Sequence, residues 1–378
     1  MDRLTTYLDH AATTPVRPEV VAAMAPFASE RFGNPSGSHR LARDARTALD
    51  DARDAVAAAV GADPGDVVFT SGGTEADNLA VLGTLPGHPA TIVTSSVEHP
   101  AVLEPARAAA RLGFSHQEAP VDADGAVDLD RLADLLGPHV AVVSVMLANN
   151  EVGTVQPFDQ VARLVRRHAP QAALHTDAVQ AAPWLDLARL AADADLLSVS
   201  AHKLGGPKGA GALVARVPVR PILHGGGQER DRRSGTHDVA GAVGLATALT
   251  LAAAERDPTA ARVRALRDRL ADGLLAAVPG TVESAPRDRV LPGHCHLRFA
   301  GVDQEELLVL LDRDGVCAAA GSACASGALQ PSHVLLAMGV PPADAKTAVR
   351  FTLGHTSTDA DVDRALAAVP AAVARLRG

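Results

Sequence analysis

The chain has 378 residues, of which 47% are hydrophobic and 21% charged, and it carries a formal net charge of -9 at pH 7. A single hydrophobic core stops growing at roughly 250 to 300 residues, so two domains are expected. The negative charge argues against nucleic acid as the main ligand, because phosphate binding needs a concentrated basic surface. The sequence has neither a basic start followed by an apolar stretch nor a run of about 18 uninterrupted apolar residues, which predicts a cytoplasmic protein that contacts no membrane.

Helices and short apolar strands alternate through the first part of the chain. Apolar residues at helical spacing predict a helix over 40–60, and Gly61 to Pro64 would end it. We expect strands over 67–70, 91–95, 140–147, 172–176 and 196–199, with helices over 75–85, 100–112, 129–136 and 158–168 between them. This alternation predicts an α/β fold, with a large domain whose mostly parallel central sheet is flanked by helices.

From about residue 253 the pattern changes. A long arginine-rich helix is expected first, then strands over 295–299 and 348–353, and a final alanine-rich helix over 359–376. These shorter elements are typical of a smaller α+β domain with an antiparallel sheet. We therefore predict a large domain over 15–252 and a small domain formed by 1–14 and 253–378.

Lys203 is the first candidate for chemistry. It follows the predicted strand 196–199, where its amine can point from irregular backbone into a crevice. Burial would lower its pKa and favour the neutral amine that attacks an aldehyde. A surface lysine in a loop is the alternative, and Lys208 could compete for the same role.

Asp177 and the turn Gly72–Gly73–Thr74 complete a possible cofactor pocket. Asp177 follows an apolar strand, and a buried carboxylate needs a cationic partner, either a protonated pyridine nitrogen or an arginine. The glycine turn joins a strand to a helix, so it can hold a phosphate with backbone amides, although Thr74 would equally serve as a helix cap. Ligands of open α/β sheets bind where strands end, so these segments together predict a site for pyridoxal 5'-phosphate.

Four further side chains suit such a site. His99 follows the strand over 91–95 and could stack on the cofactor ring and relay protons. Asn150 and Gln180 offer neutral hydrogen bonds to a phenolic oxygen, or they are turn and capping residues. Arg350 interrupts an apolar strand with a guanidinium suited to a substrate carboxylate, or to a structural ion pair.

The three cysteines form an odd and widely spaced set, which favours reduced thiols over a disulfide framework. Cys324 lies among small residues over 321–328, which predicts a loop from which its thiol can approach a ligand. Cys295 and Cys317 are interpreted as apolar filler. His294 and His296 flank Cys295, but strand alternation sends its thiol to the opposite face, so no metal site is predicted.

Many ordered motifs make the chain similar to one family from Tyr7 nearly to the end. They lie over 7–15, 32–36, 70–78, 98–99, 149–153, 198–203, 224–230, 233–236 and 350–354, and in the cysteine loop. By these motifs the chain resembles the cysteine desulfurases, in the class V aminotransferase group of fold type I pyridoxal phosphate enzymes. The length of the segment around Cys324 resembles the long-loop subgroup.

The resemblance implies a reaction and a partner. Such enzymes convert L-cysteine to L-alanine and leave the sulfur as a persulfide, here on Cys324, for delivery to an iron-sulfur scaffold or a tRNA-thiolating enzyme. Selenocysteine lyase, cysteine β-lyase and aminotransferase activities are the related alternatives. A sulfur-carrier partner without catalysis is a further one, which the presence of both Lys203 and Asp177 disfavours.

The resemblance also implies a role for each candidate residue. Lys203 would hold the cofactor as a Schiff base, Asp177 would pair with its ring nitrogen, and His99 would lie on the ring. The cofactor phosphate would be held by Gly73, Thr74, Ser200 and His202. Thr236 would reach the phosphate of a neighbouring subunit, which implies a homodimer, and Asn34 and Arg350 would hold the carboxylate of L-cysteine.

Overall fold

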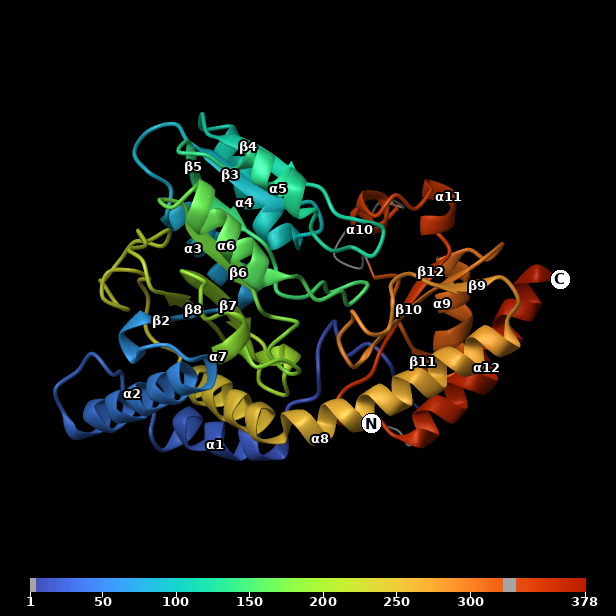
Figure 1. Cartoon of the computed structure of the whole chain (residues 1–378). Coiled ribbons are helices and arrows are strands. Elements are labelled where there is room, and N and C mark those ends of the chain that lie inside the picture. The colour runs from blue at the N-terminus through green and yellow to red at the C-terminus, as the bar shows by residue number, and fades with distance from the viewer. Residues whose placement is uncertain (1–4, 322–330) are drawn as a thin grey trace.

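The computed structural model describes residues 5–321 and 331–378, and its largest sheet has seven strands (Figure 1). Their order is β2 (Val67–Thr70), β8 (Gly211–Ala215), β7 (Leu196–Ser200), β6 (Ala173–Asp177), β5 (Val140–Ser144), β3 (Thr91–Ser95) and β4 (Ser115–Ala119). β8 runs antiparallel to both of its neighbours, and the other paired strands run parallel. The predicted mostly parallel sheet is therefore confirmed.

Helices cover both faces of this sheet. On one face, α3 (Gly73–Gly83) and α4 (Pro100–Ala110) pack against alternate strand residues such as Val68, Ile92 and Val142. The helices α2 (Arg40–Val60), α5 (Leu129–Leu135) and α6 (Phe158–His168) cover the other face. They pack against the strand residues that alternate with those above, including Val67, Val93 and Val143. Successive strand residues point to opposite faces, so the central strands are buried on both sides, whereas the edge strand β4 is polar and mostly exposed.

The helix α8 (Val239–Ala277) corrects one sequence expectation. We expected this helix to begin near residue 253, but it starts at Val239 and runs for 39 residues along the molecule (Figure 1). Its first half is apolar and lies against α2 and α1 (Pro18–Ser29), so it lacks the polar face by which sequence patterns reveal a helix. Length and composition alone would let α8 cross a membrane, but half of its most apolar window is buried in the core, so this is weak evidence.

The last part of the chain forms smaller sheets. β10 (His294–Phe299) pairs antiparallel with β12 (Ala348–Thr352) and β9 (Thr281–Glu283), as expected, and β1 (Thr6–Tyr7) pairs with β11 (Val316–Cys317). Five helices complete the described chain: α7 (Leu187–Leu190), α9 (Gln304–Arg313), α10 (His333–Ala337), α11 (Pro342–Ala345) and α12 (Asp359–Arg377).

The hydrophobic core divides into clusters. The first half of α8 belongs to the cluster under the seven-stranded sheet, and its second half belongs to a cluster with Leu8, Phe299 and Phe351. The expected boundary between residues 252 and 253 therefore falls inside one continuous helix. The division of the chain into two domains stays a prediction.

The strands β4 and β8 were not predicted from the sequence, and the bounds of β5 and α3 also differ from expectation. β5 ends at Ser144 rather than near residue 147. The Val145 and Leu147 N–H groups still donate to carbonyls of β6, but the Met146 N–H donates to the Glu98 carboxylate at 2.6 Å rather than to β3. α3 begins at Gly73 rather than Glu75, directly after the glycine turn. Both differences bring backbone groups to the edge of the sheet where the parallel strands end.

Candidate active site

A cavity of about 390 Å³ lies at the carboxyl ends of the parallel strands. β2 runs antiparallel to β8, and β8 to β7, so β2 ends at the same edge as β7, β6, β5 and β3. The predicted site residues that line the cavity are Gly73, Thr74, His99, Asn150, Asp177, Gln180, Ser200, His202, Lys203 and Arg350. Residues more than 270 positions apart in the sequence are thus brought together by the ends of the strands.

Lys203 projects into this cavity from the short helix η2 (Ala201–Lys203), directly after β7. Its amine donates hydrogen bonds to the carbonyl oxygens of Ala11 at 2.5 Å and Ala12 at 2.8 Å. The Gln180 amide also donates to the Ala11 carbonyl at 2.8 Å. The segment that contains Ala11 and Ala12, before α1, therefore passes beside Lys203 and fixes the position of its amine.

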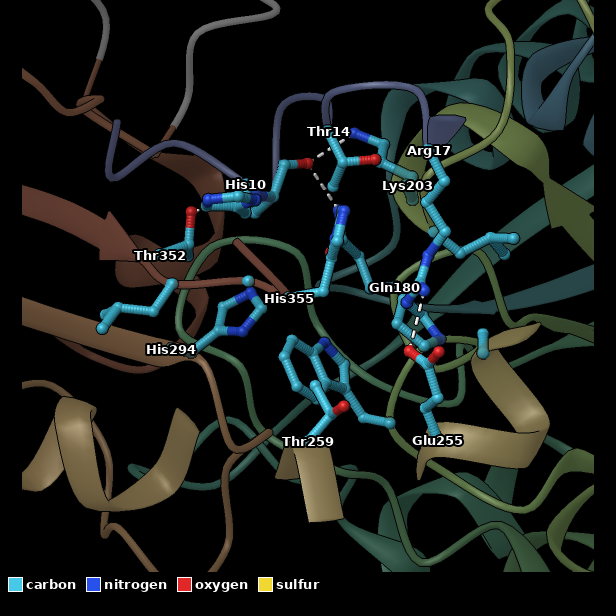
Figure 2. Close-up of a pocket in the computed structure, with 17 residues that line it drawn as sticks. His10, Thr14, Arg17, Gln180, Lys203, Glu255, Thr259, His294, Thr352 and His355 are labelled. Carbon is cyan, nitrogen blue, oxygen red and sulfur yellow. Dashed lines mark hydrogen bonds and ion pairs between the residues drawn. The ribbon is translucent and has the colours of Figure 1, made fainter. Parts of the chain in front are cut away.

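A second and smaller cavity, of about 30 Å³, borders Lys203 (Figure 2). Three histidines line it, and burial lowers the pKa of His10 and His355 to about 4 and that of His294 to about 3. The Arg17 guanidinium is paired there with the Glu255 carboxylate at 2.7 Å. This space is far smaller than the main cavity.

Asp177 ends β6 and is 6% exposed. One of its oxygens accepts a hydrogen bond from the Val179 backbone N–H at 2.8 Å. Burial raises the pKa of Asp177 to about 6, although the Val179 N–H and the charge of Lys203 act against that rise. The carboxyl is poised to ionise fully when a cation binds beside it.

Sequence reasoning missed two carboxyl groups close to Asp177. Asp77 lines the cavity, and Glu98 is completely buried. Burial raises the pKa of both well above their usual values, and the charge of Asp177 raises them further. Burial also lowers the pKa of His175 to about 3, so its imidazole is neutral where its Nε2 lies 3.5 Å from an Asp77 oxygen. Asp77 lies in the recognised stretch 70–78, but only the tertiary structure shows that it reaches the cavity.

Asp177→Asn is expected to stabilise the cofactor-free protein at pH 8 by about 3 kcal/mol. The folded-state pKa of Asp177, about 6, lies above its unfolded value, so ionisation costs stability as pH rises between about 4 and 6 and the full cost is present above pH 6. Asparagine can keep the bond from the Val179 N–H. Urea unfolding at pH 8 and at pH 4 measures the difference, and a gain of equal size at both pH values would contradict this account.

His99 and His202 are neutral at physiological pH. Burial and the charge of Lys203 lower the pKa of each to about 4. His99 caps α4 by accepting the Ala101 N–H on Nδ1 at 3.1 Å, which leaves the proton of the neutral ring on Nε2. His202 Nδ1 lies 3.2 Å from the Thr13 hydroxyl, and its carbonyl accepts the Thr14 N–H.

Backbone conformation at Gly72 and close packing at Gly73 both favour glycine in this turn. Gly72 has a φ of 147°, and a Cβ on Gly73 would lie 2.9 Å from a methyl carbon of Val179. A Cβ on Gly211 of the neighbouring strand would lie 2.7 Å from the Gly72 Cα. Backbone N–H groups at the start of α3 thus face the cavity without side chains in the way, which fits the phosphate of pyridoxal phosphate.

Three of the predicted site residues are not free side chains inside the cavity: Arg350, Asn34 and Thr236. Arg350 lines the cavity, but its guanidinium pairs with the Asp9 carboxylate at 2.7 Å and donates to the Asn150 carbonyl at 2.9 Å. Asn34 and Thr236 are exposed and do not line the main cavity within one chain. Thr236 borders another cavity beside Thr70 and Ser71. Cys324 lies outside the described residues.

The other two cysteines do not line the main cavity. Cys295 is buried in β10, and burial raises the pKa of its thiol to about 12. The neighbouring His296 places its Nδ1 2.8 Å from the Ser284 hydroxyl. Among the described residues, no group of three or more histidine, cysteine or acidic side chains could hold a metal ion.

The family model described as "Aminotransferase class-V" matches residues 6–365 of the chain. An "IscS-like cysteine desulfurase" of Mycobacterium tuberculosis is 45% identical over 98% of this chain and 97% of its own. A solved "NIFS-LIKE PROTEIN" is 35% identical with a TM-score of 0.92, covering 98% of this chain and 100% of its own. A solved structure titled "SspA in complex with cysteine" is 31% identical with a TM-score of 0.81, over 94% of this chain and 100% of its own. The chain therefore belongs to the cysteine desulfurase family.

Proposed function

We propose that the protein is a pyridoxal phosphate-dependent L-cysteine desulfurase that forms L-alanine and transfers sulfur to Cys324. The observation that carries this proposal is the convergence of Lys203, Asp177, His99 and the glycine turn on one cavity at the sheet edge. Relatives named cysteine desulfurase, and a structural neighbour whose title includes cysteine, support the substrate.

The proposed cofactor position rests on groups that line the main cavity. Gly73, Thr74, Ser200 and His202 would hold its phosphate, and Lys203 would hold its aldehyde carbon. Asp177 would meet its ring nitrogen with a charged carboxylate. Bound there, pyridoxal phosphate supplies an electron-withdrawing ring that stabilises negative charge at the α carbon of an amino acid.

The chain's own residues would then move protons and sulfur. With L-cysteine bound, the freed Lys203 amine would take the proton from the substrate's α carbon and hold it for return. The Cys324 thiolate attacks the substrate sulfur, so an S–S bond forms while the C–S bond breaks, and its electron pair stays with carbon. Carbon later gains a proton as alanine is released. Neutral His99, with Nε2 protonated in the resting ring, is suited to exchange a proton with these groups.

Borohydride reduction tests the cofactor assignment directly. Protein incubated with pyridoxal phosphate and then reduced should carry one covalent pyridoxyl group, at Lys203, when its peptides are mapped by mass spectrometry. Lys208 is exposed and serves as the internal comparison. A label on Lys208 or Lys346 instead of Lys203, or no label, would contradict the proposed pocket.

The protein's partners and location are part of the same proposal. Thr236 is exposed and outside the main cavity of its own chain, which supports a homodimer in which it reaches the phosphate of the second copy. The sulfur on Cys324 would pass to an acceptor protein in the cytoplasm, either an iron-sulfur scaffold or a tRNA-thiolating enzyme. Asn34 would join Arg350 at the substrate carboxylate.

A further inference from the structure

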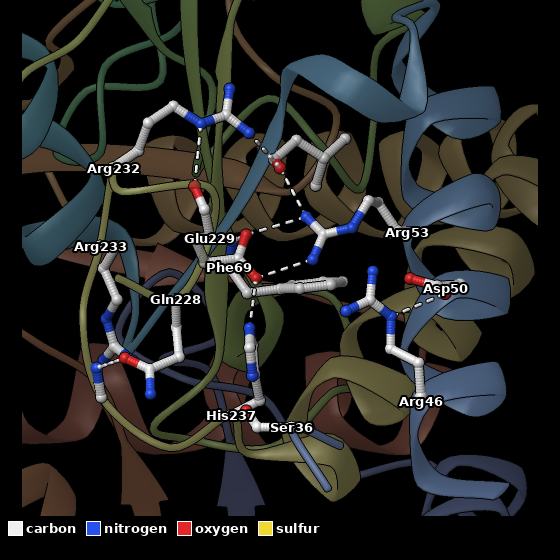
Figure 3. Close-up of polar contacts among 12 residues, drawn as sticks. Ser36, Arg46, Asp50, Arg53, Phe69, Gln228, Glu229, Arg232, Arg233 and His237 are labelled. Carbon is white, nitrogen blue, oxygen red and sulfur yellow. Dashed lines mark hydrogen bonds and ion pairs between the residues drawn. The ribbon is translucent and has the colours of Figure 1, made fainter. Parts of the chain in front are cut away.

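The strand that leads into the glycine turn lies at an edge of the sheet. β2 is the first strand in the sheet order, so its outer side has no neighbouring strand. Side chains bond that outer side instead (Figure 3). The Phe69 N–H donates to the Glu229 carboxylate at 3.0 Å, and the Val67 carbonyl accepts from the Arg53 guanidinium at 2.6 Å. Edge strands need such cover because their unpaired backbone groups are otherwise left exposed.

Glu229 is the centre of this arrangement. It is 5% exposed, and its two oxygens accept from Arg53 at 2.7 and 2.8 Å and from His237 at 2.9 Å (Figure 3). Burial alone would raise the pKa of Glu229, but the bonds from His237, Arg53 and the Phe69 N–H lower it to about 2. The carboxylate is therefore charged, and both of its oxygens accept hydrogen bonds. It connects the loop that contains Glu229, between β8 and α8, to both α2 and β2.

The backbone at Glu229 is held in an unusual conformation. Glu229, Arg230 and Asp231 have φ values of 51°, 58° and 63°, a left-handed region that side-chain-bearing residues rarely occupy, least of all in succession. Arg232 fixes the far side of this turn by donating to the Gly65 carbonyl at 2.9 Å. Strain of this kind persists only where surrounding contacts impose it, and it points to a function of the loop.

The same loop also contacts the glycine turn through hydrogen bonds. Arg233 donates to both carboxylate oxygens of Glu75, at 2.7 and 3.2 Å. Glu75 in turn accepts the Ser71 backbone N–H at 2.7 Å. Ser71 lies between β2 and Gly73. The loop that contains Glu229 and Arg233 therefore contacts β2 directly and contacts the glycine turn through Glu75.

We propose that Glu229 is a positioning residue for the glycine turn Gly72–Gly73–Thr74. By fixing the edge strand β2, it sets where the backbone amides at the start of α3 meet the phosphate of the bound cofactor. Glu229 does not line the main cavity, so it acts through β2 rather than by touching the cofactor. This inference rests on the proposed function, because it takes the cofactor's phosphate to bind at this turn.

The test compares two ligands that differ only in the phosphate. In the full chain with Glu229→Gln, the affinity for pyridoxal phosphate should fall about tenfold or more, while the affinity for pyridoxal, which lacks the phosphate, should stay within about twofold of wild type. Binding is followed by visible absorbance and by quenching of the single tryptophan. Glu283→Gln is the matched control, because it removes a carboxylate from an ion pair with Arg287, on β9 rather than beside the turn. It should change neither affinity.

The outcomes separate positioning from general support of the fold. Equal losses for both ligands in Glu229→Gln, or no loss for either, would overturn the positioning role. If Glu229→Gln does not fold, Arg53→Lys, which keeps a charge but loses the two-pronged bond, should show the same selective loss. Wild-type protein that binds pyridoxal but gains no affinity from the phosphate would overturn the role as well. Wild-type protein that binds neither ligand would overturn the proposed function together with it.

Discussion

Lys203→Ala is expected to lower alanine formation from L-cysteine by about 10⁴-fold or more and to abolish covalent retention of the cofactor. The Lys203 amine would both hold the cofactor and move the α proton, and proton transfer by a positioned group alone is worth roughly 10²- to 10⁴-fold. Alanine measured by chromatography, with saturating pyridoxal phosphate present, gives the rate. Far-ultraviolet circular dichroism checks that the variant folds.

Lys208→Ala is the matched control for this loss. Lys208 lies five residues away in the same segment, but it is exposed and does not line the cavity. We expect its rate to stay within about twofold of wild type, as is usual for surface substitutions. If Lys208→Ala lost activity while Lys203→Ala kept it, the assignment of the amine would be wrong.

Cys324→Ala is expected to keep the cofactor spectrum but lower alanine formation by about 10³-fold or more. Removing the thiol takes away the group that accepts the sulfur, while Lys203, Asp177 and the glycine turn stay in place. Absorbance on addition of L-cysteine separates substrate binding from sulfur transfer. The related alternatives, in which Cys324 is dispensable or only affects selectivity, predict nearly normal turnover in this variant.

Cys317→Ala tests whether the loss is specific to Cys324. Cys317 lies in β11 away from the cavity, and burial, with the nearby charges of Asp312 and Asp9, raises the pKa of its thiol. A thiol with a raised pKa is a poor nucleophile at neutral pH. Normal activity in this variant is the expected result, and a loss matching that of Cys324→Ala would remove the distinction between the two thiols.

The sequence predicted five of the seven strands of the large sheet but missed β8 and the mostly exposed edge strand β4. Continuous apolar runs such as 67–70 and 91–95 are identified by composition and by the turns that bound them, and both match the structure. The first half of α8 was missed because it has no polar face. It is an apolar helix surrounded by other helices, so it has no alternation of polar and apolar residues to detect.

The candidate site was predictable where its residues follow strands. Lys203 and His99 follow strands and Asp177 is the last residue of one, and the topology of the sheet brings strand ends together. The carbonyls of Ala11 and Ala12, which bind the lysine amine, are backbone groups that no sequence pattern reveals. The links of Glu229 to Phe69 and Arg53 join segments about 160 to 176 residues apart, and only the tertiary fold shows them.

The most direct test of the central claim is a single-turnover experiment with purified protein, pyridoxal phosphate and L-cysteine, without any acceptor. Mass spectrometry of the intact protein and its peptides is compared with the amount of alanine released. The account predicts one alanine per site, together with one reducible persulfide at Cys324. Pyruvate or alanine without a persulfide at Cys324, or a persulfide at another cysteine, would contradict it.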